Sequence, residues 1–410
     1  MSRRVLLHVG TPKTGTSYLQ DVLFQNRDKL LKQGVLYPAD RFDAHFLAAL
    51  DLMRLRWGGL EQEAVGAWDR LAAQVREHDD TAIISHEILA TASRTQVARA
   101  LSSIGHRLGG DTRDGGTEVH LILSVRDLVR QIPAEWQENV KHRAGFSFAR
   151  FLELIHDPER NHRVGAWFWG VQEIPDILAR WGADLPPERI HLVTVPPAGG
   201  PPDLLWKRFS EAFDLDRLDL DLTTERANPS LGVPESALIR RINRTVGRDL
   251  PPQHYRPMVR ELLAHQTLSK RTRSPRLGLP PEQYPWVHEL ADSWITELAA
   301  RGYDVVGDLE DIRGAAAPAG KWADPDHPSE RQVATAGVDA IKALLLEYAK
   351  SETENEKLRA KLEDTRRELM RARTPRLLRS MEWTVQTMER SKPGRKALGA
   401  YRSARGRPQL

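Results

Sequence analysis

The sequence predicts an α/β fold with a central parallel sheet, because strand patterns and helical patterns alternate along its first half. Three continuous apolar runs have the composition of strands covered on both faces: residues 5–9, 81–85 and 118–125. Helical patterns follow at residues 18–31 and 95–108 and from residue 128 onward. Ligands of such sheets bind where the parallel strands end, so polar residues directly after these strands are the first candidates for a site.

The other expected elements extend this sheet and cover it. An apolar run predicts a further strand at residues 189–195, residues 34–38 are expected to form a short strand or an extended turn, and residues 301–309 are expected to close the globular part. Helical spacing of apolar residues predicts helices at 45–55, 60–78, 148–155, 167–181, 201–213, 234–246, 255–265 and 286–300.

The loop after the first strand has the composition of a phosphate-binding loop. Residues 10–17 read Gly-Thr-Pro-Lys-Thr-Gly-Thr-Ser, with four residues between Gly10 and Gly15 as in nucleoside-triphosphate enzymes. Backbone N–H groups in such a loop and at the following helix N-terminus bind phosphate, so we predict a P-loop-like three-layer fold. The lysine, however, stands inside the loop as Lys13, and Thr16 follows the second glycine. This displacement argues against an ordinary ATPase or kinase, whose lysine spans the β- and γ-phosphates.

The loop resembles the 5′-phosphosulfate loop of sulfotransferases that use 3′-phosphoadenosine 5′-phosphosulfate (PAPS), with the pattern P-K-[ST]-G-[ST]-[ST]. The run from His8 to Gln20 is similar to a bacterial branch of that family, and the resemblance spans residues 4–310. The resemblance implies transfer of a sulfuryl group from PAPS to a hydroxyl without a metal. Because carbohydrate-type members are the most similar, a glycan or glycolipid is the first acceptor class that it implies, and a natural product is the second. It also implies that Lys13 stabilises the bridging oxygen and that the loop binds the donor through Thr11, Pro12, Lys13, Thr14, Gly15, Thr16 and Ser17.

A second anion contact is expected after the strand at 118–125. The resemblance implies an arginine there that binds the 3′-phosphate, often with a serine eight residues later, and Arg126 matches the first part. Its guanidinium suits bidentate phosphate binding, although a surface arginine paired with Asp127 is the alternative. Ala134 stands where the serine is expected, so Arg130, Gln137 or a backbone N–H must complete the site.

A later segment offers further donor contacts. The R-K-G-x-x-G run of vertebrate cytosolic members is absent, and residues 226–232 occupy about the equivalent place. Asn228 and Ser230 are candidates for the 3′-phosphate or the adenosine; equally, Asn-Pro-Ser is a turn that starts the helix at Pro234.

A general base is expected after the strand at 81–85, where His86 and Glu87 stand side by side. The resemblance allows either residue type, and neighbouring side chains on an extended backbone point to opposite sides, so we expect only one to face the acceptor, with a preference for Glu87. Alternatively, both are polar residues at a helix start. His45 and Trp136 are weaker candidates for acceptor contacts. Several tryptophans are candidates for a sugar or lipid pocket or for the core: Trp57, Trp68, Trp136, Trp167, Trp169 and Trp181.

Composition bounds the function. The 410 residues contain no cysteine, which excludes disulfides, thiolate metal sites and a cysteine nucleophile. No Asp/Glu/His cluster has metal-ligand spacing, and no signal peptide or membrane-spanning apolar run is visible. We therefore expect a cytoplasmic protein without a metal, with peripheral attachment at the inner membrane face left open.

Charge divides the chain. Residues 366–410 hold 13 Lys or Arg against 3 Glu, so they carry +10 and residues 1–365 carry −6. We predict a sulfotransferase domain at 1–313, a linker at 314–328, a charged helix at 329–373 and a basic tail at 374–410.

The two C-terminal segments predict partners. Apolar residues with helical spacing at 338–369 predict a long helix. It is compatible both with a solvated single helix and with a homodimer through a short coiled coil, whose seam Glu352 and Asn355 interrupt. An apolar stripe flanked by arginines at 376–407 is equally compatible with contact to an anionic membrane surface and with a disordered basic tail. Nucleic acid is disfavoured because only Trp383 and Tyr401 could stack on bases.

Two other function classes stay open. A metal-dependent nucleotide kinase with an atypical loop would require Mg²⁺ and prefer ATP to PAPS. A non-catalytic scaffold, attached to a membrane through its basic tail, would bind no nucleotide.

Overall fold

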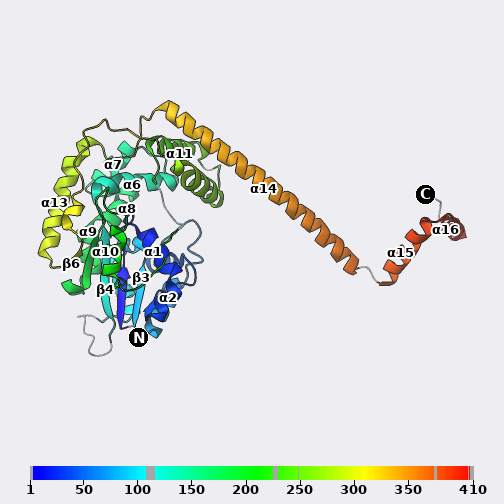
Figure 1. Cartoon of the computed structure of the whole chain (residues 1–410), viewed down its shortest axis with the longest axis horizontal. Coiled ribbons are helices and arrows are strands. Elements are labelled where there is room, and N and C mark those ends of the chain that lie inside the picture. The colour runs from blue at the N-terminus through cyan, green and yellow to red at the C-terminus, as the bar shows by residue number, and fades with distance from the viewer. Residues whose placement is uncertain are drawn as a thin grey trace. The chain divides into compact units, whose positions relative to one another are not determined.

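The computed structural model describes residues 3–107, 116–224, 230–247, 249–373, 376–404 and 406 and confirms the predicted α/β fold (Figure 1). Six strands form one all-parallel sheet in the order β2-β3-β1-β4-β5-β6. Their bounds are Arg4–His8 (β1), Val35–Leu36 (β2), Thr81–Ser85 (β3), Glu118–Val125 (β4), Ile190–Thr194 (β5) and Asp304–Val306 (β6). β1 therefore lies between β3 and β4, which are the two strands expected to carry the other functional residues.

Both faces of the sheet are buried, as the continuous apolar runs predict. On one face Leu6, Ile83 and Ile122 pack with Leu19 of α1 and Phe209 of α10. Their strand neighbours on the other face are also fully or almost fully buried: Val5, Leu7, Ala82, Ile84, Leu121 and Leu123. The rigid centre of the sheet thus fixes the ends of β1, β3 and β4 relative to one another.

Helices surround this sheet. They are α1 (Thr16–Gln25), α2 (Arg27–Lys32), α3 (Ala44–Met53), α4 (Ala67–Glu77), α5 (Arg94–Ser103), α6 (Leu128–Lys141), α7 (Phe148–His156), α8 (Arg163–Gln172), α9 (Ile174–Trp181), α10 (Leu204–Ala212), α11 (Val233–Val246), α12 (Pro252–Tyr255), the π-helix η3 (Arg256–Thr267) and α13 (Tyr284–Ala300).

Two predicted helices are divided in the structure. The helix expected at 18–31 breaks at Asn26, whose side-chain amide donates to the carbonyls of Val22 and Asp221, both at 2.8 Å. The helix expected at 167–181 breaks between α8 and α9, where Pro175 stands in the first turn of α9. An Asn that binds a distant chain segment and a Pro that removes a helix donor each favour a new helix start.

The helix expected at 60–78 is shorter than predicted. Regular helix begins only at Ala67, and Gly66 precedes it with a φ of 71°. A left-handed conformation at Gly66 ends the preceding turns, because glycine adopts positive φ without a steric penalty.

The segment predicted as a linker at 314–328 has no regular structure, yet it is attached to the globular body. The Asp326 carboxylate accepts the backbone N–H groups of Phe148 and Ala149, at 3.0 and 2.9 Å, and pairs with Arg240 at 3.0 Å. The indole of Trp322 donates to the Gly278 carbonyl at 3.0 Å. These contacts make the segment a strap across the body, which composition alone does not indicate.

The C-terminal part forms helices throughout the range that the structure describes. α14 is continuous over Glu330–Arg373, and α15 (Arg376–Glu389) and α16 (Lys392–Ala404) follow. The chain divides into two compact units, Met1–Ala343 and Leu344–Leu410. Homodimerisation through 338–369 and membrane contact through 376–407 stay predictions.

Within the described ranges, no helix combines the length and apolar character needed to cross a bilayer.

Candidate functional site

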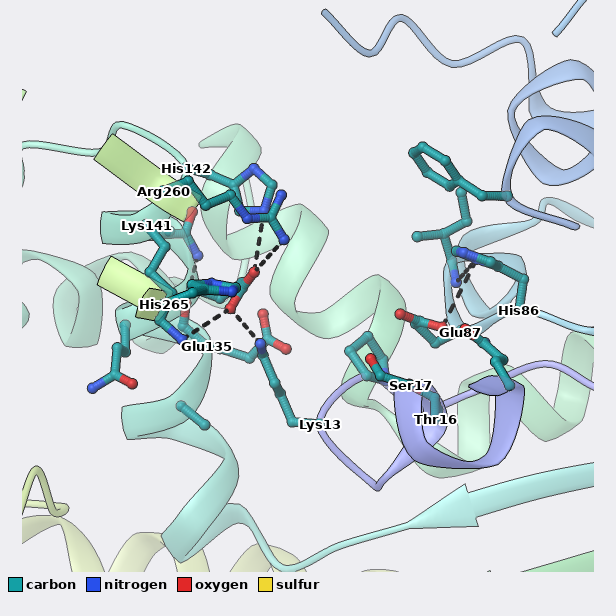
Figure 2. A pocket seen from close by; sticks show the side chains of 18 of the residues that line it. Lys13, Thr16, Ser17, His86, Glu87, Glu135, Lys141, His142, Arg260 and His265 are labelled. Carbon is teal, nitrogen blue, oxygen red and sulfur yellow. Dashed lines mark hydrogen bonds and ion pairs between the residues drawn. The ribbon is translucent and has the colours of Figure 1, made fainter. Parts of the chain in front are cut away.

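One large cavity opens where β1, β3 and β4 end. Its volume is about 1840 Å³, and residues from all three expected positions line it. The loop after β1 contributes Pro12, Lys13, Gly15, Thr16 and Ser17; the segments after β3 and β4 contribute His86, Glu87 and Arg126. Figure 2 shows Lys13, Thr16, Ser17, His86 and Glu87 around one space. The structure thus brings together residues that stand more than a quarter of the chain apart in the sequence.

The loop runs close against the segment that carries the base candidates. Gly10 has a φ of 126°, and a Cβ at this position would lie 2.9 Å from the backbone oxygen of Glu87. Any larger residue would therefore push the loop away from Glu87. This contact fixes the phosphate-type loop and the base candidates as one unit.

Buried hydroxyls support the loop from below. Thr14 Oγ1 lies 2.6 Å from the Thr11 carbonyl and 2.6 Å from Ser124 Oγ, and Ser124 Oγ donates to the Gly10 carbonyl at 2.9 Å. Thr14 is fully buried, whereas Thr16 and Ser17 line the cavity. Of the three hydroxyls expected around the lysine, Thr14 therefore holds the loop, and Thr16 and Ser17 face the space that a ligand would occupy.

His8, at the end of β1, is a supporting residue that the sequence reasoning missed. Its Nδ1 lies 2.8 Å from Ser85 Oγ and its Nε2 lies 3.0 Å from Ser124 Oγ, so it joins β1 to both neighbouring strands. Burial lowers the pKa of His8 to about 4, so the ring is neutral at physiological pH. A polar residue at the end of an otherwise apolar central strand is the signal that could have identified it.

Lys13 points into the cavity and forms an ion pair with Glu138 on α6. The other oxygen of this carboxylate accepts from His142 Nε2 at 3.1 Å and from the Arg260 guanidinium at 3.3 Å. Lys141 Nζ lies 4.0 Å from Glu138. Burial alone would raise the pKa of Glu138, but Lys13 and the other cations hold it well below its ordinary value.

Sequence reasoning did not identify Glu138. The spacing of Glu138, Lys141 and His142 along one helix face was the available signal. The partners from the loop and from η3 come together only in the fold.

Arg126 lies beside the loop without a carboxylate partner among the described residues. Its guanidinium donates to the Lys13 carbonyl at 3.1 Å and to Gln131 Oε1 at 3.4 Å, while its buried Nε has no acceptor in the described part of the chain. Burial, together with nearby Arg130, lowers the Arg126 pKa to about 10, so the group is still a cation at neutral pH. A desolvated cation of this kind is a ready site for an anion.

Asp127 pairs with Arg130 instead of Arg126. Its carboxylate accepts the Arg130 backbone N–H at 2.9 Å and contacts the Arg130 side chain, which also donates to the Pro196 carbonyl at 3.0 Å. Arg130 is therefore occupied and is not among the residues that line the cavity. The alternative expectation, an ion pair between Arg126 and Asp127, is therefore wrong.

The residues considered for the 3′-phosphate site in place of the missing serine differ in whether they line the cavity. Ala134 and Ser230 line the cavity, and Asn228 lies outside the described residues. The Gln137 side chain also lines it, but its amide is engaged with the Leu231 backbone in both directions at 2.9 Å and with Ser236 Oγ at 3.1 Å. Gln137 thus anchors the segment that brings Ser230 to the cavity.

A chain of buried amides connects the loop to Glu135. The Gln131 amide donates to the Pro12 carbonyl at 2.7 Å and to Gln172 Oε1 at 3.0 Å, and Gln172 donates to Glu135 Oε1 at 3.2 Å. Burial raises the pKa of Glu135 to about 7, partly offset by Lys13. Because Gln131 also accepts from Arg126, one side chain holds both anion contacts in position.

Both base candidates line the cavity, contrary to the expectation that only one would face it. His86 Nδ1 and Glu87 Oε2 are 3.9 Å apart. The chain turns into a short 3₁₀ helix at Glu87–Thr91, which removes the alternation of an extended backbone and brings the two side chains to one side.

The hydrogen bonds of this pair define their protonation. His86 Nδ1 accepts the Ile88 backbone N–H at 3.3 Å, so in a neutral ring the proton is assigned to Nε2. Burial lowers the pKa of His86. Burial alone would raise the pKa of Glu87, but His86 and the amide of Gln20, which donates at 2.9 Å, bring it below its ordinary value. Glu87 is therefore a carboxylate at neutral pH.

The weaker acceptor candidates are structurally engaged. His45 lines the cavity, but its Nδ1 accepts the Ser85 N–H at 3.1 Å and its Nε2 lies 3.2 Å from the Pro38 carbonyl. Burial lowers its pKa to about 3. Trp136 is fully buried and donates to the Phe146 carbonyl at 3.3 Å, so it does not reach the cavity.

Of the six tryptophans considered, Trp57 and Trp167 line the cavity. Trp68, Trp169 and Trp181 are core residues.

Within the described residues, no group of three or more His, Asp or Glu side chains is arranged to hold a metal ion.

Comparisons with known proteins give one low-level similarity. A solved structure of a sulfotransferase from Alicyclobacillus acidocaldarius is similar over 63% of this chain and 96% of that chain, with 16% sequence identity and a TM-score of 0.38. A TM-score of this size is too low to assign an activity by similarity. No protein-family model matches the chain, and no curated protein matches it.

Proposed function

We propose that the chain is a sulfotransferase that transfers the sulfuryl group of PAPS to a hydroxyl of a glycan, glycolipid or natural product. The observation that carries the proposal is the pair of cations at the loop. Lys13 enters the cavity from inside a phosphate-type loop, and Arg126 lies buried beside the same loop with its Nε unpaired among the described residues. This arrangement suits a donor with two anionic groups.

The residues present fit such a donor. The loop, the N-terminus of α1 and the hydroxyls of Thr16 and Ser17 offer hydrogen-bond donors for the 5′-phosphosulfate. Arg126 offers a charge-assisted contact for the 3′-phosphate, and Ser230 also lines the cavity.

Glu87 is the better base of the two candidates. As a carboxylate it can accept the proton of the acceptor hydroxyl, whereas the Nδ1 of His86 already accepts a backbone N–H. His86 instead offers its Nε2–H as a hydrogen-bond donor. The Gln20 amide, which donates to Glu87 Oε2 at 2.9 Å, orients the Glu87 carboxylate.

The reaction follows from these positions. Glu87 takes the proton as the acceptor oxygen forms its bond to sulfur. The bond from sulfur to the bridging oxygen breaks, and that oxygen keeps the electron pair. Lys13 stabilises the developing negative charge on it, which is the electrostatic contribution expected of a positioned cation. Glu138 retains His142 and Arg260 as partners when Lys13 turns toward the donor.

Calorimetry with 3′-phosphoadenosine 5′-phosphate, the spent donor, tests the proposal. We expect binding without metal that weakens at least tenfold in Arg126→Ala, because a charge-assisted contact contributes about 1.5–3 kcal/mol. Arg150→Ala is the matched control, since Arg150 is an exposed arginine on α7 that pairs with Glu153. Absence of metal-free binding, or a preference for ATP with Mg²⁺, would contradict the proposal and favour a kinase or a scaffold.

A further inference from the structure

A continuous aromatic surface connects the base candidates to the far end of the cavity. The rings of His86 and Phe46 stack with their centroids 5.1 Å apart, and the Phe46 and Trp57 ring centroids are 5.6 Å apart. Trp57 in turn contacts Trp167 at 6.0 Å and His142 at 5.9 Å. All five rings line the cavity and are partly accessible. The two indoles are inclined to each other by 47°, and each offers an apolar ring face to the cavity on which a sugar or aromatic ring can stack.

The far end of this surface is cationic. His142 belongs both to the aromatic surface and to the group around Glu138, which we call the Glu138 cluster: Lys13, Glu138, Lys141, His142 and Arg260. Three formal cations in the cluster surround one carboxylate. Figure 2 shows Lys141, His142 and Arg260 on the side of the pocket opposite His86 and Glu87, with the Lys13 side chain directed toward them.

Two nitrogen atoms at this end have no hydrogen-bond partner among the described residues. The Arg260 Nε and the His265 Nε2 are buried and unpaired there, although both residues line the cavity. Buried polar atoms are normally satisfied, so the unpaired N–H of Arg260 Nε at the wall of a cavity indicates a place for a ligand acceptor group. Glu135 and Glu261 also line the cavity, but over all of its lining residues eight Lys or Arg stand against five Asp or Glu, so an anionic group is the complementary partner.

We propose that the acceptor is a ring-bearing molecule with a carboxylate or phosphate, its ring on Trp57 and Trp167 and its anionic group against Arg260 and His142. This inference rests on the proposed function, because it places the accepting hydroxyl of the same molecule at Glu87. An acidic saccharide, such as a glycan that contains a uronic acid, combines a stacking ring face with a carboxylate and is the class that fits best.

A matched pair of probes tests this proposal. 4-Nitrophenyl β-glucuronide carries a carboxylate, which its methyl ester replaces with a neutral ester group one methyl larger. Binding of each is measured by calorimetry on the full chain saturated with 3′-phosphoadenosine 5′-phosphate. We expect the glucuronide to bind at least tenfold more tightly than the ester, and Arg260→Gln to bring the two affinities within about threefold of each other.

Further variants separate the ring contact from the charge contact. Trp57→Ala is expected to weaken both probes to a similar extent, and Trp57→Phe to retain most of the binding because it keeps a ring. Two controls test for misfolding: the variant Arg260→Lys, which keeps the charge, and thermal unfolding of every variant. The variant Arg150→Gln tests for the effect of losing a surface charge. Equal affinities of the two probes for the unmodified protein, or binding of neither, would overturn the proposal.

Binding of the spent donor is measured first in each protein. Failure of that step would contradict the sulfotransferase function itself. Intact donor binding without discrimination between the probes would reject only the anionic acceptor.

Discussion

Glu138 holds Lys13 in an ion pair across the cavity, although 125 positions separate the two residues in the sequence. Both side chains are largely shielded, with about one fifth of each exposed. The pair directs the lysine away from the backbone of its own loop and into the cavity. A lysine that is placed by a partner on α6 is available to a ligand without first being drawn out of solvent, which reduces the ordering cost on binding.

Replacement of Lys13 by Ala is expected to lower turnover by about 10²–10³-fold, because the charge on the bridging oxygen then develops without a cation. Affinity for the spent donor should change much less, since the loop amides and Arg126 remain. Turnover with radiolabelled PAPS and calorimetry with the spent donor measure the two effects. Equal losses in turnover and in affinity would show that Lys13 only binds the donor.

Replacement of Glu87 by Gln is expected to lower turnover by about 10²–10⁴-fold, because the acceptor hydroxyl loses its proton acceptor. His86→Asn, which keeps a hydrogen-bond donor, should have a smaller effect. Comparison of the two variants under donor saturation decides between them, and a larger loss in His86→Asn would reverse the assignment.

The pH dependence of turnover gives an independent check on Glu87. Its pKa lies below the ordinary value, so the carboxylate stays ionised as the pH falls toward that value. We therefore expect no loss of turnover from protonation of Glu87 above about pH 5. A fall in turnover with decreasing pH near neutrality that disappears in Glu87→Gln would contradict the expectation that Glu87 is ionised at neutral pH.

The sequence was sufficient for the parts of the site that follow directly after strands. Lys13, Glu87 and Arg126 stand where parallel strands end, and a parallel sheet necessarily brings such positions to one edge. The apolar runs of β1, β3 and β4 located these strands within one residue. The positions of these residues after strands, together with the resemblance of the loop to 5′-phosphosulfate loops, were therefore enough to place this half of the site.

The other half depends on helices whose rotation the sequence does not specify. Glu138 and Gln131 read as ordinary polar positions of α6, and Arg260 as one of many arginines. Their roles appear only because α6 and η3 face the loop across the cavity. Similarly, the side-by-side placement of His86 and Glu87 depends on a short 3₁₀ turn that no strong sequence pattern announces.

The continuous helix α14 allows a sharper prediction about dimerisation. Asn355, Leu362 and Leu369 are spaced by seven residues, and Leu358 lies on the same face, so Asn355 occupies a core position of a heptad repeat. Leu358, Leu362 and Leu369 are 57%, 68% and 54% exposed. An Asn at such a position is compatible with a two-stranded parallel coiled coil, in which it fixes the register. We therefore expect the full chain to be a homodimer.

Sedimentation equilibrium of the full chain measures this state. Leu362→Asp should give a monomer, whereas Ala360→Asp, which places the same charge on the opposite side of the helix, should leave the dimer intact. A monomeric unmodified chain, or dissociation by both variants alike, would contradict a coiled coil through α14.

Glu135 is expected to make the folded state less stable as the pH rises toward neutrality. Burial raises its folded pKa to about 7, whereas an unfolded carboxyl titrates near its ordinary value of 4.5. Between these two values the folded protein binds more protons than the unfolded chain, so stability falls with increasing pH and levels off above about pH 7. The loss is on the order of 3 kcal/mol.

In Glu135→Gln, which keeps an acceptor for the amide of Gln172, this contribution should be absent. Urea unfolding of both proteins at about pH 5 and pH 7.5 measures the difference. A variant that loses as much stability over this range as the unmodified chain would show that Glu135 is ionised in the fold.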